Sequence, residues 1–437
     1  MKLHFLFTMT FVLLLAALGG GCSKEKVVID GKRENIILLE TALTPEVPGD
    51  VATFTMPKTY NKRTWASPHG ATDGSRNAFI YSNKLTTKWA FSIGQGSTSN
   101  QPLMATPLFV DDRIIVLDAS GNLISYDLAT QRRVWAVPTN PSGSSSSEAL
   151  GGGICYGDGL IFVTSGFGQT SAYDFKTGKH RWTTPANAPL RIAPLFYDKK
   201  VFTISINSHM DVLDAQTGAL LWSHDGIAES AGLLGGATPV IHKNSVLVPY
   251  PSGEIFVLDR ISGKLHWSDN IASSLNLSSL GTIAHVHAQP VIDGDTALVS
   301  SHSGLLAAID VNTGVRKWFR ETTVIHTPTM TSAYIFIVND LSQVACLRKS
   351  DGKVIWVHNL VKHVPQKPEE RIFWSGPLLG DGFLYVVSSH GELVSLKVSD
   401  GTHAKTVKIP HGSKMIPQIV NNTLYVLCDN GRLVAFN

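Results

Sequence analysis

A short phrase, Asp-x-x-Thr-Gly-x-x-x-Trp, recurs along this chain at a spacing that few folds accommodate. Its clearest copies run from Asp174 to Trp182, Asp214 to Trp222, Asp259 to Trp267 (serine for threonine) and Asp310 to Trp318. Degenerate copies carry the other tryptophans of the series, Trp89, Trp135 and Trp356. Successive tryptophans are 38 to 51 residues apart. A repeat of about 40–50 residues with four short strands per unit indicates a β-propeller.

Each repeat reads as four short strands separated by turns. In the unit opened by Thr238-Pro239, three apolar runs precede the strand that holds Trp267, and polar or glycine residues separate them. That pattern is a hairpin signal. In the Asp-x-x-Thr-Gly turn the aspartate can bond its own backbone and the glycine can supply a positive φ, so we expect a tight hairpin. The indole would then wedge between neighbouring sheets.

Eight repeats begin with a similar dipeptide, which we call the opener, and their number predicts eight blades. The openers are Thr106-Pro107, Gly152-Gly153, Ala193-Pro194, Thr238-Pro239, Gln289-Pro290, Thr327-Pro328, Gly376-Pro377 and Ile416-Pro417. The last unit lacks a fourth strand, whereas the segment 79–93 before the first opener supplies one. We therefore predict an all-β, eight-bladed β-propeller of four-stranded antiparallel blades over residues 76–437. The N-terminal strand would close the ring and remove its open edges.

The first residues have the features of a targeting segment. Lys2 precedes an apolar stretch that is too short for an ordinary membrane span, and three glycines then lead to Cys22. Residues 1–21 are therefore predicted to be a signal peptide. The cysteine after small residues resembles the lipobox of bacterial lipoproteins, so lipidation is expected at Cys22. Gly19 stands where that pattern usually has leucine, and a simple secretory signal is the alternative.

The segment after the signal is expected to connect an anchor to the ring. Residues 22–75 are predicted to be a lipid-anchored tether and N-terminal wrap, with Trp65 pinning the wrap to the propeller. Ser23 follows the cysteine, and in lipoproteins a serine there implies the outer membrane. We therefore expect a periplasmic protein held on the outer membrane by a lipid only.

Charge, cysteine and histidine usage narrow the function further. The formal net charge of +3, without a long run of basic residues, argues against a protein that binds nucleic acid. Cys155, Cys346 and Cys428 lie in apolar strand runs and are expected to be buried free thiols. His285 and His287 lack a nearby carboxylate or third ligand, so we expect no metal there. No catalytic motif stands out, and no cofactor is expected.

Turn lengths predict one plain and one elaborated face. In a four-stranded blade the first and third turns share one face, and these turns are short here. The connections between blades share the opposite face with the second turns, and the long ones are residues 138–151, 183–192, 223–236, 268–288 and 357–375. Long loops on a rigid scaffold usually carry binding. Leu190 and Arg191 lie on this face and are predicted to be a partner-binding pair, with an exposed leucine as anchor.

The signal, the repeat and the blade number together resemble the BamB family, the propeller lipoproteins of the outer-membrane β-barrel assembly machinery, within the pyrroloquinoline-quinone-like repeat proteins. The resemblance implies a non-catalytic scaffold that binds a periplasmic domain of the barrel insertase BamA beside other lipoproteins of the complex. The family's Leu/Arg contact in one interblade loop matches Leu190 and Arg191. Its acidic residues in the next loop are missing, and residues 233–236 read Leu-Leu-Gly-Gly. Unfolded outer-membrane proteins pairing with blade edges are a further implied ligand.

Two other readings remain open. A quinone-dependent dehydrogenase uses the same repeat, but such enzymes hold calcium through acidic and amide side chains and usually have an adjacent cysteine pair. This sequence has no Cys-Cys, and tight turns account for its repeated aspartates, so an enzyme is not expected. The second alternative is a ligand sensor or envelope-binding protein that takes peptides or polysaccharide in the central channel. The pair Leu190-Arg191 is the only sequence feature that favours the scaffold over this ligand-binding alternative.

Overall fold

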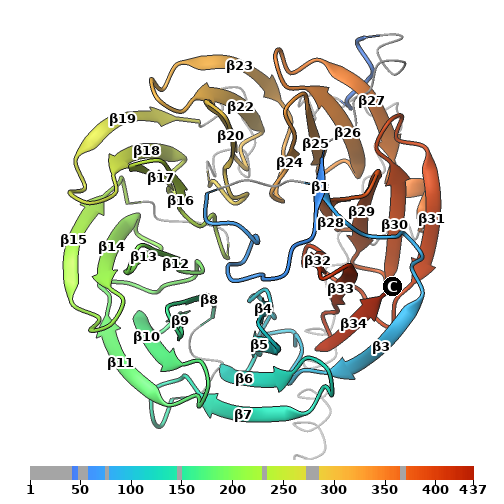
Figure 1. Ribbon diagram of the computed structural model, residues 1–437. Helices are drawn as coiled ribbons and strands as arrows, with labels where there is room; N and C mark the ends of the chain where they lie inside the picture. The colour runs from blue at the N-terminus through green and yellow to red at the C-terminus, as the bar shows by residue number, and fades with distance from the viewer. Residues whose placement is uncertain are drawn as a thin grey trace, which may run out of the picture. The chain divides into compact units, whose positions relative to one another are not determined.

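The computed structural model describes residues 42–47, 58–73, 78–144, 150–228, 234–271, 285–364 and 371–437, all of them in one compact unit, residues 40–437. These residues form an all-β propeller in which eight sheets surround a common centre (Figure 1). The predicted signal peptide, Cys22 and the boundary at residue 76 lie outside the described residues.

Seven of the eight sheets have four strands. Six of them follow the chain as blades 1 to 6: β4 (Leu108–Val110), β5 (Arg113–Leu117), β6 (Asn122–Asp127), β7 (Arg133–Pro138); β8 (Gly152–Gly157), β9 (Leu160–Ser165), β10 (Gln169–Asp174), β11 (His180–Pro185); β12 (Leu195–Tyr197), β13 (Lys200–Ile204), β14 (His209–Asp214), β15 (Leu220–Asp225); β16 (Val240–His242), β17 (Ser245–Pro249), β18 (Glu254–Asp259), β19 (Leu265–Asn270); β20 (Val291–Asp293), β21 (Thr296–Ser300), β22 (Leu305–Asp310), β23 (Arg316–Glu321); β24 (Thr329–Met330), β25 (Tyr334–Val338), β26 (Gln343–Arg348), β27 (Val354–Asn359). A short 3-10 helix, η2 (Leu360–His363), follows β27.

The N-terminal strand closes the ring, as the missing fourth strand predicted. Blade 8 comprises β32 (Gln418–Val420), β33 (Thr423–Leu427), β34 (Arg432–Phe436) and β3 (Thr87–Ser92). β3 runs antiparallel to β34, with Trp89 opposite Ala435 and Phe91 opposite Leu433. The last edge of the chain is therefore paired with a strand from its beginning.

One sheet departs from the predicted four antiparallel strands. Blade 7 contains β28 (Trp374–Gly380), β29 (Phe383–Ser388), β30 (Glu392–Lys397) and β31 (His403–Lys408), to which β1 (Thr59–Tyr60) and β2 (Ala78–Phe79) add in parallel. β28 is the innermost strand of its blade, so its free edge faces the channel. The two short N-terminal strands occupy that edge, and Asp381 N donates to Phe79 O (2.9 Å).

Burial within a blade follows from its neighbours. The first three strands pack against the adjacent blades on both faces, so they bury nearly every residue, as β22 does. The fourth strand lies at the rim and alternates, as β23 does. Cys155, Cys346 and Cys428 lie among the buried residues as free thiols, and burial raises the pKa of each. They behave as small apolar side chains.

The turns are distributed between the two faces as the sequence predicted. On one face, the third turn of each of blades 1 to 7 donates a backbone hydrogen bond to the first turn: Leu128 to Asp112, Phe175 to Gly159, Ala215 to Lys199, Arg260 to Asn244, Val311 to Asp295, Lys349 to Ala333 and Val398 to Gly382. On the other face, the interblade connections bond to the second turns, for example Thr139 N to Gly121 O (2.9 Å). We call these the tight-turn face and the interblade face.

The repeat motif joins neighbouring blades. The Trp267 indole donates to Val311 O in the next blade (2.9 Å), and a Cβ on Gly314 there would lie 2.8 Å from the indole ring. The same pairing of a tryptophan with the next blade's glycine recurs five more times: Trp135 with Gly178, Trp182 with Gly218, Trp222 with Gly263, Trp318 with Gly352 and Trp356 with Gly401. The glycine thus supplies both a positive φ and room for the indole.

This coupling explains the irregular copies of the motif. Blade 7 has Lys405 at the tryptophan position of its fourth strand. The blade after it is blade 8, whose third and fourth strands come from opposite ends of the chain, so no turn is present for an indole to meet. Trp89 of blade 8 faces blade 1, where Gln131 stands in place of the glycine with φ of 57°. The junction of blades 7 and 8 therefore has neither motif residue, whereas the junction of blades 8 and 1 keeps its tryptophan and has lost the glycine.

Candidate functional site

The N-terminal segment 58–73, which we call the strap, crosses the middle of the ring (Figure 1). Its backbone bonds to four blades: Lys62 O accepts from Asn421 N (2.8 Å), Trp65 and Phe109 exchange two bonds (2.6 and 2.9 Å), Ala66 O accepts from Tyr156 N (2.8 Å), and Thr72 O accepts from Ile241 N (2.9 Å). The buried Trp65 side chain packs in the core that blades 1, 7 and 8 share. Asn421 belongs to a first turn, so the strap enters at the tight-turn face.

Above the strap lies a cavity of about 390 Å³. Each blade contributes a residue at or near its opener: Thr106, Gly152, Ala193, Thr238, His287, Thr327, Ser375 and Ile416. The strap supplies Pro68 and His69. The cavity is therefore the central channel at the interblade face, with the strap as its floor. Its volume lies in the range of small-molecule sites, roughly 300–1,000 Å³.

The lining combines apolar side chains with two cations. Leu103, Met104, Ile325, Phe373 and Met415 supply apolar surface. Arg191 and Lys414 supply positive charge, and the described lining contains no carboxylate and no side-chain amide. The Lys414 ammonium lies 5.8 Å from the centre of the Phe373 ring. The cavity is therefore an apolar space with an excess of positive charge.

The structure separates the two residues of the predicted partner-binding pair. Leu190 is buried, with 1% of its surface exposed, so the expected exposed anchor is wrong. Its backbone N–H donates to Ser165 O (3.1 Å), which turns the side chain into blade packing. Arg191 follows at the cavity wall, and its buried Nε has no hydrogen-bond partner among the described residues. The arginine is available to a ligand, whereas the leucine supports its loop.

His285 and His287 hold interblade connections together. The His287 Nδ1 lies 3.2 Å from Ile325 O and its Nε2 lies 3.3 Å from Leu234 O. Burial lowers the pKa of His287, and the same cause, with the neighbouring His287, lowers the pKa of His285 to about 3. Both nitrogens of His287 face backbone carbonyls, so neither is directed at a metal shared with His285. Among the residues that the structure describes, no group of three metal-binding side chains occurs.

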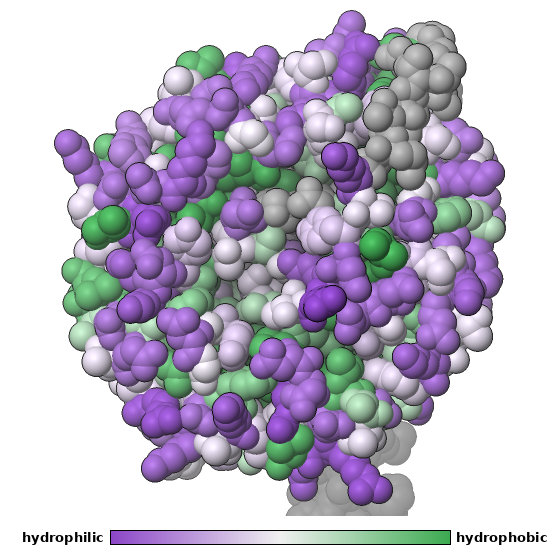
Figure 2. Space-filling model, viewed as in Figure 1, coloured by the Kyte–Doolittle hydropathy of each residue, from purple (hydrophilic) through white to green (hydrophobic). Residues whose placement is uncertain are grey.

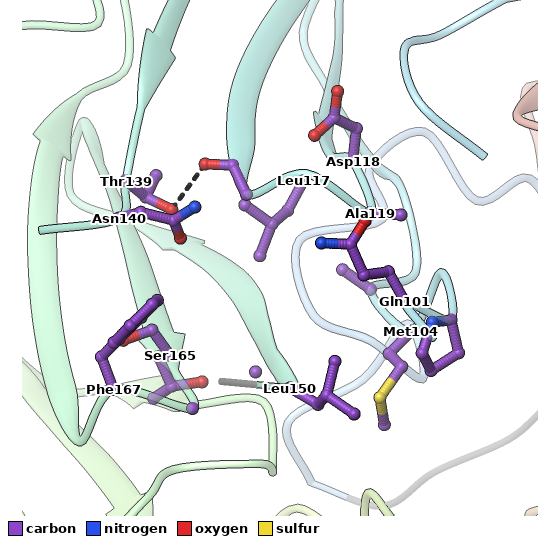
Figure 3. Close-up of a pocket in the computed structure, with 17 residues that line it drawn as sticks. Gln101, Met104, Leu117, Asp118, Ala119, Thr139, Asn140, Leu150, Ser165 and Phe167 are labelled. Atoms are coloured by element: carbon purple, nitrogen blue, oxygen red, sulfur yellow. Dashed lines mark hydrogen bonds between the residues drawn. The ribbon is translucent and has the colours of Figure 1, made fainter. Parts of the chain in front are cut away.

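A smaller pocket opens between blades 1 and 2 beside the cavity (Figure 3). Its volume is about 50 Å³, and it shares Met104 and Gly152 with the cavity. Asp118 at its edge accepts backbone N–H bonds from Ser120 (3.0 Å) and Asn122 (2.9 Å). This carboxylate is engaged in shaping its loop. The space suits a few water molecules rather than an organic ligand.

The surface outside the cavity is mainly polar. Figure 2 shows hydrophilic side chains around the periphery of the ring, with apolar residues in small separate patches. Exposed apolar side chains are scattered over fourth strands and turns, as at Ile261 and Phe319, and Leu220 and Leu221 are neighbours on β15. Scattered exposed apolar residues are normal on a soluble surface. Among the described residues, no helix has the length and apolar character to cross a bilayer.

Comparison with known proteins agrees with the repeat. Residues 120–358, more than half of the chain, match the family described as outer membrane protein assembly factor BamB. The chain belongs to this family. The match begins between β5 and β6 and ends in β27, so it covers the second half of blade 1 and nearly all of blades 2 to 6.

Individual relatives in this family are distant. An uncharacterized protein of Rickettsia prowazekii is 25% identical over 81% of this chain and 88% of its own length. The outer membrane protein assembly factor BamB of Moranella endobia is 22% identical over 55% of this chain and 60% of its own length.

Solved structures show the same fold with different activities. BamB from Moraxella catarrhalis superposes with a TM-score of 0.68 at 18% identity, covering 81% of this chain and 99% of that one. A quinohemoprotein alcohol dehydrogenase from Comamonas testosteroni also gives 0.68, at 13% identity, covering 90% of this chain and 82% of that one. The propeller fold is therefore common to BamB proteins and dehydrogenases, and the fold alone does not separate them.

Sequence reasoning found the openers but not the cavity that they surround. The openers marked strand starts, and their convergence on one channel follows only from the closed ring. Lys414 carried no recognisable motif. The sequence predicted that Trp65 pins this segment to the ring, but it did not predict the strap's role as a floor, because the strap's bonds to blades 2, 4 and 8 are made by backbone groups that any sequence possesses.

Proposed function

We propose that this protein is a non-catalytic scaffold lipoprotein of the outer-membrane β-barrel assembly complex. It binds the periplasmic part of the barrel insertase BamA through its interblade connections. The observation that carries the proposal is the match of residues 120–358 to the family described as outer membrane protein assembly factor BamB. Relatives that bear this name are similar to about half of this chain.

The form of the ring supports a scaffold. Blades are tied to each other by an indole and a glycine at six junctions, and the ends of the chain are paired in blade 8. A ring of this kind holds the strands from which its connections start in fixed positions, which limits the entropic cost of binding. All interblade connections emerge on one face, so a partner can meet several blades at once.

Arg191 is the residue that we assign to partner contact, with Leu190 beneath it as support. Arginine is enriched at the centres of interfaces, where its fork of donors finds acceptors. The cavity wall presents this guanidinium without an internal ion pair among the described residues. Other lipoproteins of the complex and unfolded outer-membrane proteins are further proposed partners. Cys22 is proposed to carry the lipid that holds the protein on the outer membrane.

The quinone-dependent enzyme has less support. A calcium-bound quinone needs acidic and amide ligands, and the described cavity lining provides neither. The sequence also lacks an adjacent cysteine pair. The residues present do not fit that cofactor, and no reaction step is assigned to the cavity.

The test is recovery of partners from gently solubilised envelopes. Tagged wild type is compared with Arg191→Glu, and Arg132→Glu on the tight-turn face serves as the matched charge reversal. The proposal predicts that wild type and Arg132→Glu recover the barrel insertase and that Arg191→Glu loses it while remaining folded. Absence of the insertase from the wild-type sample contradicts the scaffold. If the Arg191→Glu variant still recovers the insertase, Arg191 is not part of the interface.

A further inference from the structure

The cavity has the chemistry of a ligand site in its own right. It has a floor, formed by Pro68 and His69 of the strap, and a mouth at the interblade face. A ligand therefore enters from one side and stops against the strap. The wall is mainly apolar, which favours a ligand with an apolar body.

Two cations of the lining set the sign of the ligand's charge. Arg191 opens blade 3 and Lys414 opens blade 8, so they approach the cavity from different blades. The guanidinium of Arg191 makes no hydrogen bond or ion pair with the described residues, although its Nε is buried. An anionic oxygen at the cavity wall would supply acceptors for charge-assisted hydrogen bonds from this group. The described lining itself contains no carboxylate. The Asp429 carboxylate, which accepts from the Lys414 backbone N–H (3.1 Å), lies outside the lining.

Phe373 and Met415 add a surface suited to a ring. Phe373 is exposed and lies beneath the Lys414 ammonium at 5.8 Å, and Met415 follows Lys414 along the wall. Aromatic faces and methionine sulfur both pack well on planar apolar groups. The cation and the apolar surface are thus adjacent, which matches a molecule with its charge next to its ring.

We propose that the central cavity binds a small organic acid with an apolar, ring-containing body, whose anionic group is held by Arg191 and Lys414. The ligand is bound as an anion and undergoes no reaction. The site shares Arg191 with the proposed partner contact, but it requires only the ring and its strap, so ligand binding is tested with the purified protein and without the insertase.

A matched pair of probes tests the charge requirement. 1-Anilinonaphthalene-8-sulfonate is an anion, and N-phenyl-1-naphthylamine has the same apolar body without the charge. Titration calorimetry with the purified protein is expected to give one sulfonate per chain, bound at least about tenfold more tightly than the neutral amine. Equal binding of the two probes overturns the proposal.

Variants place the site within the molecule. Arg191→Met and Lys414→Met keep an apolar stem and remove one charge each, and each is expected to weaken sulfonate binding about tenfold with little effect on the amine. Arg132→Met and Lys176→Met remove the same charges from tight turns and are expected to leave binding unchanged. Circular dichroism confirms that each variant is folded. Wild-type affinity in the folded Arg191→Met, Lys414→Met double variant contradicts the assignment, whatever the insertase does.

Discussion

At the scale of single residues, the motif is a contact between blades rather than a property of one blade. The sequence predicted the tight turn, the positive φ and the wedging indole from residue types alone. It did not predict that each indole meets the glycine of the following blade, because those residues lie more than 40 positions apart in most pairs, as Trp135 and Gly178 do. Only the register of the closed ring brings them together.

Replacing Gly314 with alanine tests this contact. Gly314 and Gly159 share a φ of +78°, but a Cβ on Gly314 would meet the Trp267 indole at 2.8 Å, whereas a Cβ on Gly159 meets nothing within 4 Å. Gly159→Ala is expected to cost only the backbone strain, roughly 1–2 kcal/mol. Gly314→Ala is expected to add roughly 1–3 kcal/mol from overpacking. Urea unfolding measures both; equal losses would contradict a role for the indole.

Because of the aspartates in its tight turns, the free energy of unfolding of this protein is expected to depend on pH. A hydrogen bond from Arg181 (2.6 Å), together with that from Thr177 (2.8 Å), lowers the pKa of Asp174 to about 2 from 3.8. A carboxyl whose folded pKa is lowered stabilises the fold above its unfolded pKa, and that contribution disappears as pH falls from about 4 toward 2.

The Asp174→Asn variant should show this loss directly. Its melting temperature is expected to lie below that of wild type at pH 6, and the gap is expected to close as the pH approaches 2. Asp158→Asn changes a turn aspartate that has no recorded side-chain partner among the described residues, and its gap is expected to stay constant. A difference in melting temperature between Asp174→Asn and wild type that does not change with pH would contradict this contribution of Asp174.

At the scale of elements, the sequence predicted strands where apolar runs were bounded by turns, and it missed strands that have no pattern. The closing strand β3 was found because blade 8 lacked a partner and residues 79–93 supplied one. The two-residue strands β1 and β2 were missed, because two residues have no periodicity and their pairing uses backbone groups only. Leu190 was misplaced for a similar reason: a loop position does not reveal which way its side chain points.

Truncation tests whether these N-terminal elements are needed. A chain that begins at residue 42 retains the described strap, β1, β2 and β3, and we expect it to unfold cooperatively as a monomer. A chain that begins at residue 94 loses the strap, β1, β2 and β3 and exposes the edge of β34, so we expect aggregation and a lower melting temperature. Light scattering and calorimetry measure both. A monomeric, equally stable shorter chain would show that closure by β3 is unimportant.

At the scale of the whole molecule, the assignment of turns to faces was predictable because strand direction alternates, and the backbone bonds between turns confirm it. The cavity was not predictable, because it forms where eight openers and the strap converge. The proposed location of the protein on the outer membrane rests on Cys22, which lies outside the described residues.

Cys22→Ser tests the proposed anchor. If Cys22 carries the lipid, wild type is expected to sediment with outer membranes and the variant to remain soluble in the periplasm. Cys155→Ser changes a buried thiol inside the ring and is expected to leave the distribution unchanged. Sedimentation of the Cys22→Ser variant with outer membranes would show that a lipid on Cys22 is not what holds the protein there.

The central claim, a scaffold that meets the barrel insertase through its interblade face, is tested most directly by photo-crosslinking in cells. Ile227 follows β15 on the interblade face and is 61% exposed, and Ile261 lies in a tight turn and is 59% exposed. Each is replaced in turn by p-benzoylphenylalanine, so residue type and exposure are matched. We predict an adduct with the insertase from position 227 and none from 261. An adduct from 261 without one from 227 would place the partner on the opposite face and contradict the claim.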